Sequence, residues 1–203
     1  MERMPVYPGT EEPQLLKPYT IEVQGFRETK LSFYSHTGTH MDAPAHMLSM
    51  GKNLEEFSLD KFIGKAVLLE FKNKRSKKIQ IEDLSPLEVK LREAEFLIIN
   101  TGWHVYWGSP QYFKDFPALT EEAAKWLLQF NLKGVAIDAI SIDSMESQKF
   151  NVHEAFMKED MIIIENLNNL SSITEDIFTF IAMPLKYKEA DGAPVRAAAI
   201  LGE

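Results

Sequence analysis

The sequence predicts an α/β protein, with a mixed β-sheet at the core of a single compact domain over residues 1–203. Several short runs along the chain are apolar at every position, which is typical of strands covered on both faces. Segments with helical periodicity lie between them, so strands and helices alternate, and strands are the more numerous. The length of 203 residues and the hydrophobic fraction of 45% suit one soluble domain with a sizeable core.

Strands account for most of the predicted regular structure. They are expected, in chain order, over residues 19–26, 30–34, 66–71, 96–99, 134–137, 161–164, 177–183 and 195–201. The first of these alternates weakly between apolar and polar residues, whereas those from 66 to 164 hold the continuous apolar runs. These runs therefore predict the buried centre of the sheet.

One longer helix is predicted over residues 119–130, with shorter ones over 86–93 and 152–157. Thr120 is a suitable N-cap, and the two glutamates that follow it suit the positive end of a helix. Four apolar side chains of this segment fall on one face at helical spacing: Ala123, Trp126, Leu127 and Phe130. That face is expected to pack on the sheet.

Composition excludes several classes of protein. The net charge of -8 opposes a nucleic-acid partner, and the one basic run, 72–78, is typical of a solvated loop tip. There is no cysteine, hence no disulfide, and no apolar stretch of membrane-spanning length. The first residues lack the apolar core of a signal peptide. We therefore expect a cytoplasmic protein that acts on a small molecule, without a membrane or nucleic-acid partner.

Three of the five histidines lie within eleven residues, with a carboxylate among them: His36, His40, Asp42 and His46. Imidazole and carboxylate together are ligands of zinc, and also of manganese and iron. Gly38 and Pro44 oppose a continuous helix here, so we expect an irregular loop at a strand end. Packing without a metal is the alternative, but it would bury several polar groups without a shared partner.

Further ligands are expected from distant segments, because an open catalytic site is rarely built from one stretch of chain. His153 follows a loop rich in serine and aspartate, and Glu165 ends the apolar run 161–164. A carboxylate at the end of a buried strand needs a cation or hydrogen-bond donors. His104 lies in an aromatic stretch, which favours a place in a pocket wall or on the surface.

The segment from His36 to His46 resembles the signature HxGTHxDxPxH of the cyclase-like metal-dependent hydrolases. Other segments resemble further blocks of the same family in the same order: 5–9, 100–103, 134–143, 153–170 and 191–196. The best-described members are bacterial kynurenine formamidases, which hydrolyse N-formylkynurenine, and isatin hydrolases are close relatives. The resemblance thus extends over nearly the whole chain.

This resemblance implies a site for two divalent metals per subunit, zinc in the first place and manganese as an alternative. The positions that match His36, His40 and Asp42 hold one metal in the dinuclear zinc members. Asp42 and Glu165 match bridging carboxylates, and His153 matches a ligand of the other metal. The implied fold is of the swivelling β/β/α type, assembled as homodimers or homotetramers.

The implied activity is arylformamidase-like hydrolysis of an amide-type C–N bond by metal-activated water. His46 matches the catalytic acid and base, which would act as the proton shuttle. Tyr7 and Trp103 are expected to form an apolar wall for an aromatic substrate. Lactam opening, as in isatin hydrolases, and cyclisation are alternatives in the same scaffold, and a metal-binding protein without catalysis is an alternative of another class.

Two features depart from the family pattern. Tyr7 stands where kynurenine formamidases carry a tryptophan that stacks on the substrate, although tyrosine also offers an aromatic face. The leading strand DLTxPL of the family has no counterpart before Pro5. We therefore expect either a different edge of the sheet or a chain that starts later.

Overall fold

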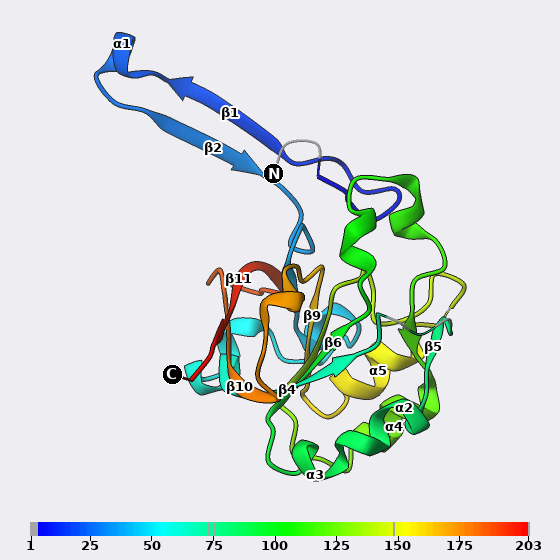
Figure 1. Cartoon of the computed structure of the whole chain (residues 1–203). Coiled ribbons are helices and arrows are strands. Elements are labelled where there is room, and N and C mark those ends of the chain that lie inside the picture. Colours follow the sequence, from blue (N-terminus) through cyan, green and yellow to red (C-terminus); the bar gives the residue numbers. More distant parts are fainter. Residues whose placement is uncertain (1–3, 73, 75, 148, 203) are drawn as a thin grey trace.

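A closed β-barrel forms the centre of the protein (Figure 1). The computed structural model describes residues 4–202, apart from 73, 75 and 148. Within this described part, seven strands close the barrel in the order β10-β11-β3-β9-β8-β6-β4. Their bounds are β3 His40–Asp42, β4 Ile63–Glu70, β6 Phe96–Asn100, β8 Gly134–Ile137, β9 Ile162–Glu165, β10 Ile177–Pro184 and β11 Gly192–Ile200.

The barrel is mixed, as the sequence predicts for the sheet. The pairs β4–β6, β6–β8 and β8–β9 are parallel, and the remaining pairs are antiparallel. Closure itself is not predicted by the sequence. It arises because β10 pairs with β11 along one edge and with β4 along the other, which joins the two ends of the sheet.

The predicted apolar runs are confirmed as strands, and every residue of β6, β8 and β9 is buried. Alternate side chains of each strand point to opposite faces. In β6, Leu97 and Ile99 belong to a cluster shared with the helices, whereas Phe96 and Ile98 belong to a cluster made of strand and loop residues. The second cluster fills the barrel, so both faces of these strands are covered.

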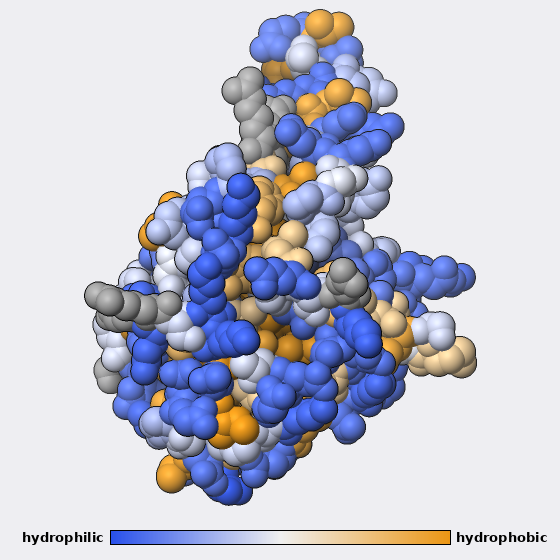
Figure 2. Space-filling view, turned by 90° about the vertical axis from the view of Figure 1, so that its right-hand side faces the viewer, coloured by the Kyte–Doolittle hydropathy of each residue, from blue (hydrophilic) through white to orange (hydrophobic). Residues whose placement is uncertain are grey.

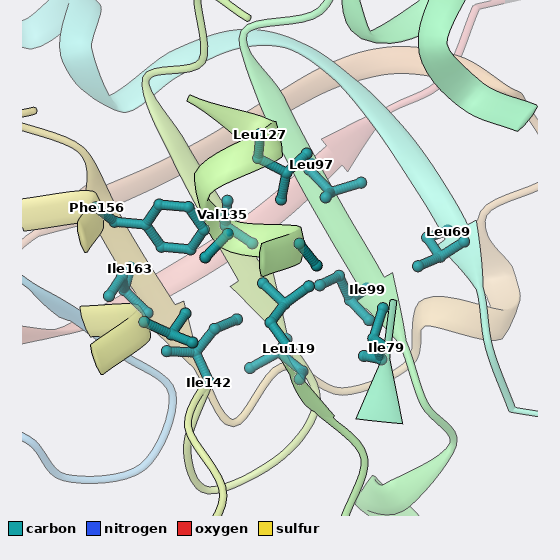
Figure 3. Packing of buried hydrophobic residues seen from close by; sticks show 14 of the residues in the cluster. Leu69, Ile79, Leu97, Ile99, Leu119, Leu127, Val135, Ile142, Phe156 and Ile163 are labelled. Atoms are coloured by element: carbon teal, nitrogen blue, oxygen red, sulfur yellow. The ribbon is translucent and has the colours of Figure 1, made fainter. Parts of the chain in front are cut away.

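Short helices cover the outside of the parallel strands. Leu127 of α4 (Glu121–Leu127) and Phe156 of α5 (Asn151–Met157) pack with Leu97, Val135 and Ile163 (Figure 3). The smaller elements nearby are α2 Ile81–Leu84, α3 Glu88–Leu91 and the paired strands β5 Lys78–Ile79 and β7 Ala118–Leu119. In the described residues, no helix has the length and apolar character needed to cross a membrane.

The N-cap prediction for α4 is confirmed, because the Thr120 hydroxyl accepts the Ala123 N–H at 3.2 Å. The helix is shorter than the predicted 119–130. Leu119 instead lies in β7, where it pairs with Ile79 of β5. Tertiary strand pairing thus overrides the local helical pattern at this end.

A hairpin arm, defined here as residues 14–32, projects away from the barrel (Figure 1). Its strands β1 Gln14–Tyr19 and β2 Glu28–Ser32 pair antiparallel, and α1 Ile21–Gln24 lies at its tip. The prediction of a strand over 19–26 is wrong, because β1 ends at Tyr19 and a helical turn ending at Gly25 (φ 80°) follows. Hydrophobic side chains lie exposed among hydrophilic ones on this arm (Figure 2): Leu16, Tyr19, Ile21, Val23, Phe26 and Leu31.

Candidate metal centre

The candidate site lies where β3 runs between β9 and β11. The register of the first pair places His40 directly opposite Glu165, and the register of the second places Asp42 opposite Gly192. The expectation of an irregular loop across the whole histidine segment is therefore wrong for residues 40–42. They form a strand because both backbone edges are paired, and this pairing brings the distant carboxylate of Glu165 to the histidines.

The first group of candidate ligands meets around one oxygen of Asp42. Nδ1 of His36 lies 2.6 Å from Oδ1 of Asp42, and Nε2 of His40 lies 3.2 Å from the same oxygen. Oε2 of Glu165 lies 3.7 Å from Nε2 of His40. Ligand atoms about 2.0–2.2 Å from a tetrahedral metal lie roughly 3.3–3.6 Å apart. The two separations at His40 are close to this value, whereas His36 and Asp42 lie at hydrogen-bond distance and would have to move apart to share a cation.

The second group uses the other oxygen of each carboxylate. Nε2 of His153 lies 3.7 Å from Oδ2 of Asp42 and 3.4 Å from Oε1 of Glu165. Asp42 and Glu165 therefore each present one oxygen toward His40 and the other toward His153. All four side chains are buried, and burial of so many ionisable groups is costly unless a cation or donors are shared among them.

The second ring nitrogen of His40 and that of His153 each have a hydrogen-bond acceptor. Nδ1 of His40 lies 2.8 Å from the Gly38 carbonyl, and Nδ1 of His153 lies 2.7 Å from Oδ2 of Asp143. Each of these contacts places the ring proton on Nδ1 and leaves Nε2 free to face the carboxylates. Metal-binding histidines are oriented in this way, so the donor set fits divalent metal.

Charge dominates the site. Burial by itself would lower the pKa of His36, but hydrogen bonds to Asp191 and Asp42 raise it to about 10. The pKa values of His40 and His153 are also raised, against burial, chiefly by Asp42 and Asp143 respectively. The surrounding carboxylates thus hold protons on the three histidines, and divalent cations can replace protons at the metal-facing nitrogens.

His46 differs from the other histidines of the cluster. It ends the 3₁₀ turn η1 (Pro44–His46), and its ring centroid lies 3.8 Å from that of His36 at an interplanar angle of 35°. Burial lowers the pKa of His46 to about 4, so the ring is neutral at pH 7. Among the described residues the ring has no hydrogen-bonded carboxylate, with Oδ2 of Asp191 at 3.9 Å.

A cavity of about 400 Å³ opens over this cluster. Its polar floor holds the candidate ligands and His46, and its apolar wall includes Tyr7, Met47, Ile140 and Phe150. The predicted substrate residue Trp103 does not line this cavity. It lines another one with His104, and its indole N–H donates to the Tyr112 carbonyl at 3.0 Å.

The structure thus brings together all the predicted ligands, His46 and Tyr7, and leaves Trp103 apart. Sequence reasoning missed the residues that hold the ligands from behind: Asp143, Asn166 and Asp191. It also missed Phe150, which is in the left-handed region at φ 46° beside the cavity. For Asp143, Asn166 and Asp191 the one signal in the sequence was that each lies within a segment that resembles a family block.

A closed barrel with buried histidines and carboxylates at its strand ends is typical of a metal-dependent hydrolase. The family model described as "Putative cyclase" matches residues 1–144, and the chain belongs to this cyclase family. Kynurenine formamidase of Bacillus thuringiensis (strain Al Hakam) is 29% identical over 191 residues, which cover 89% of this chain and 86% of that protein.

Solved structures have the same fold. A potential metal-dependent hydrolase with cyclase activity is 28% identical, with a TM-score of 0.81 over 98% of this chain and 92% of its own. An isatin hydrolase bound to the product analogue thioisatinate gives a TM-score of 0.85 over 96% of this chain and 83% of its own. Its identity is 19%, so this likeness concerns the fold alone.

Proposed function

We propose that this chain hydrolyses an amide-type C–N bond of a small aromatic substrate, as an arylformamidase does. The observation that carries the proposal is the sharing of Asp42 and Glu165 between two histidine groups. Carboxylates shared in this way are how hydrolases hold two cations about 3.5–4 Å apart. The kynurenine formamidase relatives support the choice of bond.

The described side chains suit two divalent cations. One would be held by His36, His40 and Asp42, and the other by His153, with Asp42 and Glu165 between them. Zinc is the first choice because neutral imidazole and carboxylate suit it, and manganese accepts the same donors. When bound, such cations lower the pKa of water toward about 7 and polarise a carbonyl group.

His46 is the proton carrier in this proposal. Its neutral ring accepts a proton from the attacking water and then delivers it to the leaving nitrogen. Three features support this role: the lowered pKa, the position on the cavity and the side-chain exposure of 29%. A histidine protonated in the resting protein could not take up that proton.

The substrate is expected to lie against the apolar wall of the cavity. Tyr7 and Phe150 supply aromatic faces there, and Met47 and Ile140 complete the wall. In both an N-formyl aryl amine and a fused lactam such as isatin, the amide carbonyl is bonded to a nitrogen that is itself attached to an aromatic ring. The kynurenine formamidase relatives favour the first, and lactam opening is the second outcome of the test below.

The test combines metal analysis of purified protein with hydrolysis assays on N-formylkynurenine, isatin and an aryl ester. Two equivalents of zinc or manganese and turnover of N-formylkynurenine support the proposal. Turnover of isatin alone would reassign the substrate to a lactam. Turnover of the ester alone would show that the proposed C–N bond is wrong. A protein that binds metal but hydrolyses none of the three substrates would instead be a metal-binding protein, and the proposed reaction would be wrong.

We also propose that the chain works as a homo-oligomer, with a second copy packed on the hairpin arm. An isolated two-stranded hairpin is at best marginally stable in water. The arm exposes apolar side chains on both strands and at its tip, including Val23 at 79% and Phe26 at 51%. The arm spans residues 14–32, which is close to the roughly 20–30 residues that one side of a specific interface uses.

A further inference from the structure

Asp191 lies at the start of β11 and belongs to neither group of proposed ligands. Its Oδ2 lies 3.0 Å from Nε2 of His36, and it also accepts the Ser35 hydroxyl at 3.3 Å. The Tyr187 hydroxyl lies 3.4 Å from the other carboxylate oxygen and donates its proton to the Gly192 carbonyl. Two donors from adjacent residues, Ser35 and His36, thus fix the direction of this half-exposed carboxylate.

We propose that Asp191 is a positioning residue, which selects Nδ1 of His36 as the metal-binding atom and holds the His46 ring beside it. This inference rests on the proposed function, because it assumes a cation between His36 and Asp42. It extends that function by adding a residue that would touch neither metal nor substrate.

The contacts of the two ring nitrogens determine the tautomer of His36. Nδ1 is the nitrogen that faces Oδ1 of Asp42, at 2.6 Å, so Nδ1 is the atom available to a shared cation. A metal-bound nitrogen carries no proton, and the neutral ring must then carry its proton on Nε2. Asp191 accepts the hydrogen bond from that position, which favours this tautomer and fixes the plane of the ring.

The backbone next to Asp191 supports the same ring from the other side. A Cβ on Gly192 would collide with Cε1 of His36 and lie 2.8 Å from its Nε2. The Cε1–Nε2 edge of the ring therefore lies close to the glycine, and Asp191 accepts from Nε2 at the same edge. His46 stacks on this ring at a centroid distance of 3.8 Å, so the orientation of His36 also sets the position of His46.

A purely structural role for Asp191 can be separated from this one. The Asp191 carbonyl accepts the Ala43 N–H at 2.9 Å, which helps to join β3 and β11. That contact uses the backbone and survives a change of side chain. Substitution of the side chain therefore leaves the strand pairing intact and removes only the side-chain contacts with His36, Ser35 and Tyr187.

The test is a titration with Zn²⁺ against a competing chelator, which measures the affinity of each metal in the absence of substrate. Asp191→Ala is expected to weaken one of the two metals about 10- to 100-fold and leave the other unchanged. Asp191→Asn keeps an acceptor oxygen without the charge and is expected to stay within a few-fold of wild type. Thermal unfolding of each variant reports whether the fold is retained.

Two control variants sharpen the result. Glu189→Gln removes a charge from the same loop, on a side chain that is paired only with Lys188 among the described residues, and should leave both affinities unchanged. Asp143→Ala removes the partner of His153 Nδ1 and should weaken the other metal instead. We therefore expect the Asp143 variant and the Asp191 variant each to weaken the binding of a different one of the two metals.

Either of two outcomes overturns the proposal. Asp191→Ala with both affinities at the wild-type value means that Asp191 does not position His36. If the two substitutions Asp191→Ala and Asp191→Asn lower the zinc affinity equally, the charge of Asp191 acts on the metal and its hydrogen bond does not position His36. Both results leave the proposed hydrolysis standing, whereas a wild-type protein that binds no metal refutes both proposals. A wild-type protein that binds metal without hydrolysis refutes only the proposed function.

Discussion

The Tyr112 hydroxyl donates to Oδ1 of Asn166 at 2.6 Å, and Nδ2 of Asn166 donates to the Gly38 carbonyl at 2.9 Å. The same carbonyl is the partner of His40 Nδ1. Tyr112 is fully buried, and burial raises its pKa, so the hydroxyl keeps its proton. A proposed metal ligand is thus anchored through two side chains to the aromatic core.

Tyr112→Phe is expected to lower the free energy of unfolding by about 1–3 kcal/mol, because it leaves a buried amide oxygen of Asn166 without its donor. Urea unfolding of metal-free protein measures this loss. Metal affinity should fall less than in a variant that lacks the His40 imidazole, because the ligand itself remains. Tyr106→Phe, at a partly exposed tyrosine, is the control and should change stability little. Equal stability of Tyr112→Phe and wild type would show that this hydrogen bond contributes nothing measurable.

His46→Ala is expected to keep both metals and lose about 10²- to 10⁴-fold in turnover, the usual contribution of general acid–base catalysis. His40→Ala is the contrasting variant and should lose metal together with activity, because Nε2 of His40 faces both carboxylates. Metal content by elemental analysis separates the two variants. Loss of metal from His46→Ala would make His46 a ligand, and its role as a proton carrier would be wrong.

The metal-stripped protein is expected to lose stability as the pH rises from 6.5 toward 10. His36 has a pKa of about 10 in the fold and 6.5 as the ordinary value, so the folded state binds this proton more tightly. Its contribution is therefore fully present below pH 6.5 and is lost as the pH rises through 10. One such proton changes the free energy of unfolding by at most about 1.4 kcal/mol per pH unit.

Chemical unfolding after treatment with a chelator, at pH 7 and at pH 9.5, measures this slope. His36→Asn removes the titrating ring and should flatten the decline. Bound zinc should also reduce it, because the cation takes the place of the proton. A metal-free protein whose stability rises between these two pH values would contradict the charge arrangement described for the cluster.

The parallel half of the barrel could be predicted from the sequence because buried parallel strands are apolar at every position. The runs at β6, β8 and β9 carry that pattern without interruption. Barrel closure could not be predicted, since it depends on the pairing of β10 with both β4 and β11. No local sequence pattern predicts that segments so far apart in the chain pair with each other.

His36, His40 and Asp42 could be predicted as candidate ligands because histidine and aspartate stand so close together in this segment. His153 and Glu165 stand alone in the sequence, and they could be predicted from the resemblance to the family and, for Glu165, from its place at the end of a buried strand. Asp143 and Asp191 could not, because a single aspartate near a glycine or serine is typical of any loop. Their effect comes from contacts with His153 and His36 that only the fold creates. The hairpin arm was predicted only in part, since the expected strand over 30–34 overlaps β2 but the one over 19–26 is wrong. Its apolar residues resemble those of a core strand but are exposed in one copy of the chain.

That exposure leads to a prediction about assembly. We expect the wild-type protein to sediment as a dimer or tetramer, and Val23→Glu combined with Phe26→Glu to shift it toward the monomer. Charges placed on side chains that a second copy would cover lose their hydration on association, which raises the dissociation constant. Val89→Glu is the matched control, since Val89 is 76% exposed on α3, away from the arm. Sedimentation at several concentrations, with metal content as a check on the fold, measures the shift. A wild-type monomer at all concentrations, or an arm variant that associates as tightly as the control, would mean that a second copy does not cover this arm.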